Sequence, residues 1–380
     1  MPKIDYYINP QQQREASRFP VDSSAIMDES IIRFHRKLPG YKATSLYSLH
    51  HLASELNIGE ILLKDESTRF TVGAFKSLGA SWAIHNFISK NTGKYTFCTA
   101  TDGNHGRAVA WSARIFDQKA VVFMPAGSVE ARIEFIRQEG AEVIIVEGDY
   151  DAAVERAATE AFEKDYILVQ DTSWEFYEDI PRLIMAGYST QMREIDEIYE
   201  YPQFPPFDIV ILQSGVGSWA ASVAVYLLNR YGENSPRIVI VEPSESDCLL
   251  ESVKRGTITK TCKSQNTIMA GLNCGSPSLI AWKILKETAD AFISIPDEWT
   301  CKAIRLLSGK SKLNLTYDSI PIIETCESGA AGLGALLAIM QLDELLDFRG
   351  QLGINTKTRF QIINTEGITD PVMFNNINGV

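Results

Sequence analysis

One lysine stands where an uncharged amine could act as a nucleophile. In KDESTRFTVGAFKSLGA (64–80), a strand ends, the chain turns at Gly73, and a helix is expected to begin near Ala74. Lys76 then lies in the first turn of that helix, where the positive end of the helix dipole opposes its charge. We therefore expect a lowered pKa and a neutral amine suited to imine formation. An exposed surface lysine is the alternative, although the apolar neighbour Phe75 favours a packed turn.

A second segment, ATDGNHGRAVAW (100–111), runs from a strand through a glycine-containing turn into a helix. Backbone N–H groups at such a helix start can hold a carboxylate or a phosphate. Asn104 offers a donor and an acceptor suited to a phenolic oxygen. Asp102 is an acid at the carboxyl end of a strand, where open α/β sheets bind their ligands. The alternative is structural, with Asp102 as a helix N-cap and Gly103 as a turn residue.

Two more strand ends carry turn motifs. QSGVGSWAAS (213–222) follows a strand, and its two glycines would let a phosphate approach the backbone at a helix start. Its spacing is not GxGxxG, because Ala220 takes the third position, and it is not a P-loop. In IINTEGITDP (362–371), the hydroxyl of Thr365 could face a heterocyclic nitrogen. The alternative for this segment is a simple exit from a strand into a turn.

Each of these signals is weak alone, but together they match one cofactor. Pyridoxal 5′-phosphate (PLP) needs a lysine that forms an imine, a partner for its ring oxygen, a phosphate site and a partner for its ring nitrogen. Lys76, Asn104, the turn at 215–218 and Thr365 could supply these four groups. The sequence therefore predicts a PLP site.

Short apolar strands alternate with helical segments from residue 60 onward. This alternation is typical of parallel sheets covered on both faces, so we expect an α/β doubly wound architecture. The strand–helix units before about residue 187 and those after residue 208 could form two separate sheets. YEDIPRLIMAG (177–187) is expected to lead into a long helix to about Tyr199, and the polar segment 257–277 to form a loop over a site. The predicted strands are 60–64, 95–100, 120–124, 142–146, 167–170, 208–212, 237–241 and 359–363, and the predicted helices include 73–90, 130–140 and 151–164.

The composition limits the classes of partner. The chain has 380 residues, with 36 Lys and Arg against 48 Asp and Glu, and its net charge of −12 disfavours nucleic acid. It has no apolar run long enough for a transmembrane helix and no signal-peptide pattern at its start. The six scattered cysteines and five histidines show no ligand spacing, which predicts no disulfide framework and no metal site. We expect a cytoplasmic protein that binds small molecules and no membrane.

Longer blocks of the sequence resemble the fold-type II PLP enzymes, the tryptophan-synthase-β-like group, and within it the diaminopropionate ammonia-lyase family. These blocks follow the family's order from about residue 39 to 371. They are PGYKATSLYSLHHLASELNIGEILLKDESTRF (39–70), AFKSLGA (74–80), TDGNHGRAVAW (101–111), QSGVGSWAAS (213–222), MAGLNCGSPS (269–278), ESGAAGLGAL (327–336) and NTEGITDP (364–371). The resemblance implies two open, twisted, mostly parallel sheets flanked by helices.

The resemblance also implies a division into two domains, with the active site between them. The small α/β domain would comprise residues 76–187. The large PLP-binding domain would comprise residues 1–75 together with residues 188–380. A homodimer is implied as well.

Roles for single residues follow from the same resemblance. Lys76 is expected to bind PLP covalently through its amine, Asn104 to hydrogen-bond the ring oxygen, and Thr365 to face the pyridine nitrogen. The phosphate is expected to be held by Gly215, Val216, Gly217 and Ser218. Asp102 is implied as a second catalytic acid and base, on the face of the substrate opposite Lys76. The expected substrate-binding residues are Asp171, near the substrate's amino groups, Thr101 and His105.

The implied reaction is β-elimination of ammonia from 2,3-diaminopropionate, which gives pyruvate and ammonia. Lys76 would remove the Cα proton from one enantiomer, and Asp102 could do so from the other. The nearest alternative is a serine/threonine dehydratase or a β-replacement enzyme of the same fold, which needs no carboxylate at the place of Asp102. A non-catalytic PLP-binding homologue is an alternative of another class. A Rossmann oxidoreductase is disfavoured because neither glycine turn fits GxGxxG.

Overall fold

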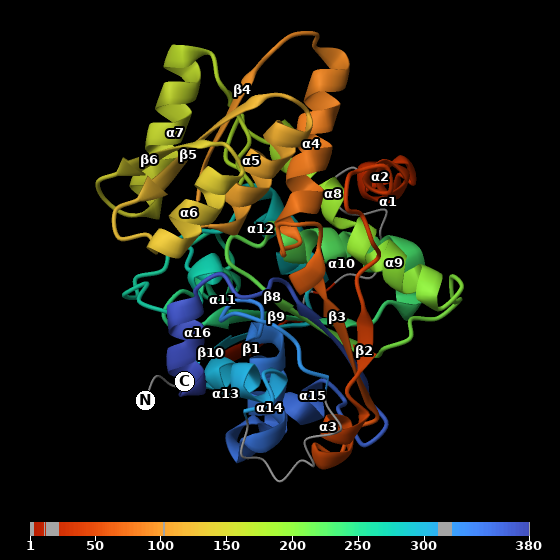
Figure 1. Ribbon diagram of the computed structural model, residues 1–380. Coiled ribbons are helices and arrows are strands. Elements are labelled where there is room, and N and C mark those ends of the chain that lie inside the picture. The colour runs from red at the N-terminus through yellow and green to blue at the C-terminus, as the bar shows by residue number, and fades with distance from the viewer. Residues whose placement is uncertain (1–3, 11, 13–22, 102, 311–320, 380) are drawn as a thin grey trace.

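The computed structural model describes residues 4–10, 12, 23–101, 103–310 and 321–379. Two sheets form the frame of the molecule, and helices pack on both faces of each (Figure 1). The strands of the large sheet are, in spatial order, β1 (Asp5–Ile8), β10 (Ala291–Ile295), β9 (Arg237–Pro243), β8 (Ile209–Gln213), β11 (Arg359–Asn364), β3 (Glu60–Asp65) and β2 (Leu46–Ser48). Those of the small sheet are β6 (Glu142–Val146), β5 (Lys119–Pro125), β4 (Thr96–Ala100) and β7 (Ile167–Leu168).

Most strands run parallel to their neighbours. In the large sheet, only the edge strands β1 and β2 pair in the antiparallel direction, and every described pairing in the small sheet is parallel. Long apolar runs in β8 and β9 suit this arrangement, because helices bury both faces of a parallel strand. The predicted α/β fold with two mostly parallel sheets is confirmed.

The helices fall into two groups along the chain. Those beside the small sheet are α4 (Lys76–Lys90), α5 (Asn104–Ile115), α6 (Glu130–Gln138) and α7 (Tyr150–Lys164). The others are α1 (Ser24–Met27), α2 (Ser30–His35), α3 (His50–Glu55), α8 (Asp179–Tyr188), α9 (Thr190–Ile198), α10 (Ser218–Tyr231), α11 (Cys248–Arg255), α12 (Leu279–Thr288), α13 (Asp297–Leu307), α14 (Ala331–Gln341), α15 (Leu346–Gln351) and α16 (Pro371–Asn378). Within the described ranges, no helix combines the length and the apolar character needed to cross a bilayer.

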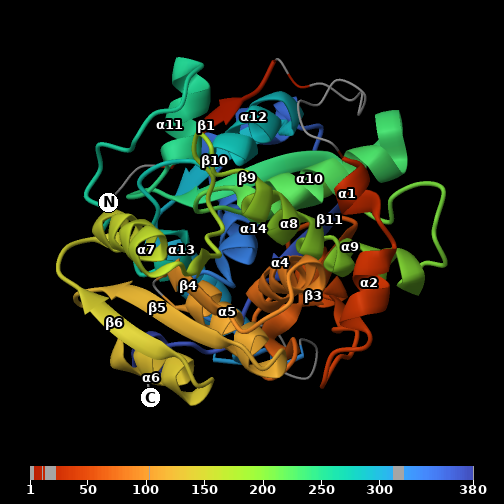
Figure 2. The ribbon, with the colours of Figure 1, turned by 90° about the horizontal axis from the view of Figure 1, so that it is seen from above.

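Side chains alternate between the two faces of each strand, and each face has its own core. In the small sheet, Cys98 and Phe123 pack toward Ala153 of α7, whereas Val122 faces the opposite side. The cluster on that opposite side continues into the large sheet as far as Phe292 of β10. The view from above shows α4, α8 and α10 lying between the two sheets (Figure 2). Because the core is continuous there, the domain bounds 76–187 and 1–75 with 188–380 stay a prediction.

Two expectations about elements need correction. The long helix expected to end near Tyr199 is two helices, α8 and α9, which meet at Ser189. The hydrogen bonds from Ser189 N to Ala186 O (3.1 Å) and from Met192 N to Ser189 O (3.1 Å) tighten the backbone there to a three-residue spacing. The strands β1, β2 and β10 are also additional to the predicted set.

A buried ionic network fixes the segment that leads to Lys76. The Lys64 ammonium donates to Glu194 Oε2 at 2.6 Å, and the Arg69 guanidinium donates to both Glu194 oxygens at 2.7 and 2.8 Å. Arg69 also pairs with Glu66 at 2.8 Å, and all these side chains are fully buried. Burial alone would raise the pKa of Glu194, but Arg69 and Lys64 lower it to about 2. The network thus ties the end of β3 to α9 and holds the loop before α4.

We predict that Glu194→Gln lowers the free energy of unfolding by about 3–5 kcal/mol, because it leaves a buried positive charge without its partner. The matched control is Glu197→Gln on the same helix. Glu197 pairs with Arg36 at the surface, so its loss should cost less than about 1 kcal/mol. Denaturant unfolding at neutral pH measures both variants. Equal, small losses in the two variants would contradict this account of the network.

Because the folded-state pKa of Glu194 is depressed to about 2, its ionised form stabilises the protein at neutral pH. This stabilisation should be lost progressively as the pH falls from the ordinary pKa range of a glutamate toward about 2.

Candidate active site

The carboxyl ends of strands from both sheets open onto one cavity. Its empty volume is about 940 Å³, including the part open to solvent. Every described residue that the sequence analysis assigned to the site lies on its wall: Lys76, Thr101, Asn104, His105, Asp171, Gly215, Val216, Gly217, Ser218 and Thr365. Asp102 lies outside the described residues. The fold therefore brings together segments that are far apart along the chain.

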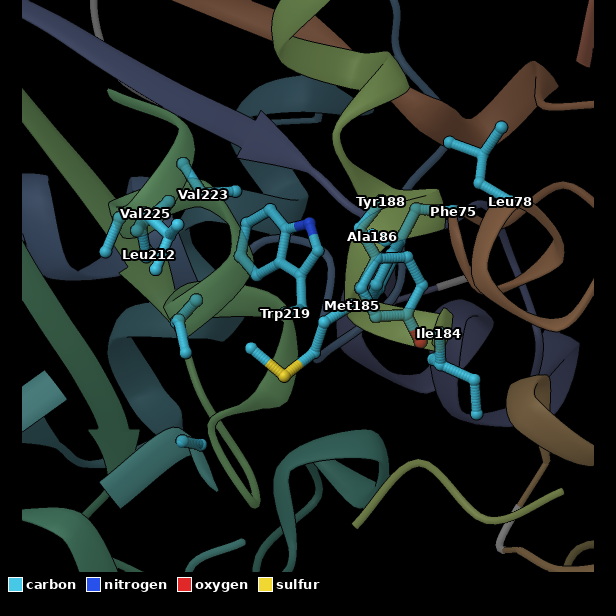
Figure 3. Packing of buried hydrophobic residues seen from close by; sticks show 14 of the residues in the cluster. Phe75, Leu78, Ile184, Met185, Ala186, Tyr188, Leu212, Trp219, Val223 and Val225 are labelled. Carbon is cyan, nitrogen blue, oxygen red and sulfur yellow. The ribbon is translucent and has the colours of Figure 1, made fainter. Parts of the chain in front are cut away.

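The helix expected to begin near Ala74 begins at Lys76, the first residue of α4, so Lys76 does lie in its first turn. The side chain of Phe75, one residue earlier, packs between two aromatic rings, with ring centroids 4.9 Å from Tyr188 and 5.2 Å from Trp219. Figure 3 shows these three side chains close together, with Trp219 to one side of Phe75 and Tyr188. This packing holds the backbone at Lys76 in place, and so fixes the point on the cavity wall from which the Lys76 side chain extends.

The Lys76 amine pairs closely with the carboxylate of Asp171, which follows β7. Burial opposes the charge of the amine, but Asp171, aided by Tyr188, raises the pKa of Lys76 above its ordinary value. The lowered pKa expected from the helix dipole is therefore wrong for this state of the protein. The dipole acts with partial charges, whereas Asp171 places a full negative charge in contact with the amine.

Asp171 is ionised in this arrangement. Burial would raise the pKa of Asp171, but His105 and Lys76 lower it to about 2. Its backbone carbonyl accepts a hydrogen bond of 2.6 Å from Ser218 Oγ. Asp171 thus links the reactive amine to the turn at 215–218.

His105 lies behind Asp171. Its Nε2 is 2.7 Å from Val169 O, and since a carbonyl oxygen only accepts, Nε2 must carry the hydrogen. Its Nδ1 is 3.7 Å from Asp171 Oδ2. Burial lowers the pKa of His105, and Lys76 lowers it further, against the opposing effect of Asp171. The ring contacts the backbone and Asp171, so the expected contact of His105 with substrate stays a prediction.

The glycine turn after β8 leads directly into α10. Gly217 has a φ of +96° and precedes the first helical residue, Ser218. This left-handed conformation favours glycine. Gly217 has no side chain to cap the helix start, and the residues Gly217, Ser218, Trp219 and Ala220 line the cavity. Such a turn has the form of an anion site.

Thr365 follows β11 and is buried on the cavity wall. The side-chain amide of Gln213, at the end of the neighbouring strand β8, donates to Thr365 Oγ1 at 3.3 Å. Gln213 was not among the residues expected from the sequence to form the site. A polar residue at the end of the apolar run DIVILQ (208–213) is the signal that could have found it.

Two charged residues that the sequence analysis did not assign also line the cavity. Glu366 accepts a hydrogen bond of 2.6 Å from the Cys326 thiol, and burial raises its pKa. Arg132 of α6 has its guanidinium 3.9 Å from Glu327. Glu366 lies within the block NTEGITDP (364–371), but Arg132 sits in an ordinary amphipathic helix, where no sequence signal marks it.

The polar segment 257–277 reaches the cavity as expected. Its residues Ala270, Gly271, Leu272 and Cys274 form part of the wall. The backbone N–H of Gly271 donates to Ser328 Oγ at 2.9 Å, which fixes this part of the segment against the large sheet's side of the cavity.

Comparison with known proteins identifies relatives with the same architecture. Residues 37–340 match the family described as "Pyridoxal-phosphate dependent enzyme". The chain is 39% identical over 370 residues to a diaminopropionate ammonia-lyase of Salmonella typhimurium, covering 91% of this chain and 90% of that protein. It is 25% identical over 315 residues to an L-threonine ammonia-lyase of Thermotoga maritima, covering 83% and 71%.

A solved structure agrees over the full length. The crystal structure of diaminopropionate ammonia lyase from Escherichia coli in complex with an aminoacrylate-PLP azomethine reaction intermediate superposes with a TM-score of 0.89. The two chains are 37% identical, and the alignment covers 100% of this chain and 97% of that one. This chain therefore belongs to the pyridoxal-phosphate-dependent enzyme family, as a homologue of the diaminopropionate ammonia-lyases.

Proposed function

We propose that this protein is a PLP-dependent ammonia-lyase that eliminates ammonia from 2,3-diaminopropionate and, after hydrolysis, yields pyruvate and a second ammonia. One observation carries the proposal: the Lys76 amine, the Asp171 carboxylate and the turn at 215–218 meet in a single cavity. The 39% identity with the Salmonella enzyme over 91% of the chain supports it.

The residues of the cavity fit PLP. A Cβ added at Gly215 would lie 2.8 Å from Cys274 Sγ and 3.2 Å from Gly271 O, so glycine keeps this turn open. The uncapped start of α10 offers N–H donors beside it. We assign the phosphate to Gly215, Val216, Gly217 and Ser218. We assign the ring oxygen to Asn104, the ring nitrogen to Thr365 and the covalent bond to Lys76.

When bound, PLP withdraws electrons from the substrate's Cα. We assign removal of the Cα proton to Lys76 Nζ. An amine that has accepted this proton is an ammonium ion, and Asp171 beside it stabilises that charge. The contact that raises the pKa of Lys76 therefore makes it a stronger base. At Thr365, a neutral hydroxyl leaves the ring a weaker electron sink than a carboxylate would, which suits elimination.

Acidic groups at the cavity suit a substrate with two amines. Asp171 and Glu366 lie on the wall, and a diamino acid brings one more positive charge than serine or threonine does. With a pKa of about 2, Asp171 stays ionised at neutral pH and accepts hydrogen bonds from an ammonium group. We assign protonation of the leaving amine to Asp102, which the family resemblance also implies as the base for the other enantiomer.

We also propose that the enzyme works in the cytoplasm as a homodimer. The family resemblance supports the dimer. All six cysteines are free thiols in the structure, which is compatible with a reducing compartment.

We predict that Gly215→Ala weakens PLP binding at least about tenfold, since a steric cost near 1.4 kcal/mol corresponds to that factor. The added methyl group collides with Cys274 Sγ and the backbone of Gly271. The matched control is Gly350→Ala, where an added Cβ meets no atom within 4 Å. Equilibrium dialysis of PLP with each purified variant measures the effect. Unchanged affinity in Gly215→Ala would contradict the assignment of this turn to the phosphate.

The substrate assignment predicts rapid release of pyruvate and ammonia from 2,3-diaminopropionate, and slow or no release from serine and threonine. Parallel assays of both products, with each amino acid at equal concentration, measure this. Faster turnover of serine or threonine would instead favour a dehydratase. A PLP-loaded protein inactive on the whole panel would favour the non-catalytic homologue.

The same panel tests Asp102. In Asp102→Asn, turnover of one enantiomer of diaminopropionate should fall by about 10²–10⁴, the usual contribution of a general acid or base, and turnover of the other should fall much less. Equal small losses for both enantiomers would mean that Asp102 serves only as a helix cap.

A further inference from the structure

The side-chain amide of Gln213 contacts three backbone carbonyl oxygens and one hydroxyl oxygen. Its Nε2 is 2.9 Å from Ile363 O, 3.1 Å from Gly329 O and 3.3 Å from Ser328 O. It is also 3.3 Å from Thr365 Oγ1. Gln213 is 3% exposed and lies on the cavity wall.

These contacts define which way the amide points. A flipped amide would place its oxygen against three carbonyl oxygens, which repel it, so the nitrogen must face them. The oxygen Oε1 then lies toward Gly332, where an added Cβ would be 3.1 Å away. Within the described part of the chain, this buried oxygen has no hydrogen-bond partner.

The direction of the hydrogen bond to Thr365 follows from the chemistry of the amide. An amide nitrogen has no lone pair that can accept, so Gln213 donates and Thr365 Oγ1 accepts. The hydroxyl proton of Thr365 is therefore not used in this contact. It remains available for an acceptor in the cavity.

We propose that Gln213 is a positioning residue: by donating to Thr365 Oγ1, it directs the hydroxyl proton of Thr365 toward the ring nitrogen of PLP. The inference rests on the placement of Thr365 given in the proposed function. Glu366, the next residue, is engaged on Oε1 by the Cys326 thiol rather than by the amide. The hydrogen bond at the ring nitrogen would then depend on Gln213, at the end of the neighbouring strand β8.

The test uses holoenzyme loaded with PLP that carries ¹⁵N in its ring. In Gln213→Met, a side chain of similar length has no N–H to donate, and the Thr365 hydroxyl can turn to the carbonyls of Ser328 and Ile363. The ring ¹⁵N resonance should then move toward that of an unprotonated pyridine without a hydrogen bond. PLP affinity should fall about fivefold, as expected for one lost hydrogen bond.

The matched control is Gln361→Met. Gln361 is fully buried, its Oε1 also lacks a partner within the described residues, and its Nε2 donates to Ile362 O at 2.8 Å. It lies on the adjacent strand β11 but not on the cavity wall. Thermal unfolding should show comparable stability losses in the two variants, whereas only Gln213→Met should shift the ring signal.

Thr365→Val completes a double-mutant cycle. This variant alone should shift the ring signal in the same direction, and adding Gln213→Met to it should produce no further shift. If Gln213→Met fails to retain PLP, Gln213→Asn replaces it, because a shorter amide cannot reach Thr365. An unchanged ring signal in the Gln213 or the Thr365 variant, or an equal shift in Gln361→Met, overturns the inference. These spectra need no turnover, so they test the role of Gln213 even if the protein is inactive on every amino acid assayed.

Discussion

The contact between Lys76 and Asp171 is the interaction on which the cavity depends. An amine in the first turn of a helix is disfavoured by the dipole, and Asp171 offsets that cost with a full negative charge. The same residue accepts a hydrogen bond from Ser218 through its backbone. One short segment after β7 therefore joins the base to the phosphate turn, and His105 stands behind it. Moving this segment would change both the charge of the amine and the position of the turn.

The packing around α4 makes this contact rigid. An added Cβ at Gly79 would lie 2.5 Å from Tyr188, and one at Gly187 would lie 2.5 Å from Leu78 O, so α4 and α8 approach closely because both carry glycine at the crossing. Before the helix, the Arg69–Glu194 ion pair closes the other end of the loop. The lysine is thus supported on both sides of its backbone, as precise proton transfer requires.

Local patterns predicted much of this architecture. Apolar runs such as AVVFM (120–124) and RIVIV (237–241) identify central strands, because both of their faces are buried. The strand β10, with the sequence AFISI, has the polar Ser294 within its short apolar run, and it pairs with β9 and β1. The three-residue β2 is too short to show a period. The break between α8 and α9 has no proline to announce it, and the nearest glycine, Gly187, lies inside α8.

The site was predictable as a set of strand-end motifs, because parallel sheets place such ends together. Pairwise contacts were not. Lys76 and Asp171 are 95 residues apart, and Gln213 and Thr365 are 152 apart. No local pattern shows that these side chains meet. The direction of the Lys76 pKa shift was wrong for this reason, since the helix start was visible in the sequence and the carboxylate partner was not.

Chemical trapping of the bond between the protein and PLP tests the central claim most directly. The holoenzyme is reduced with borohydride, digested and mapped by mass spectrometry. The account predicts a pyridoxyl group on Lys76 and on no other lysine. A label on a different lysine, or a protein that binds PLP without any reducible bond, would contradict it.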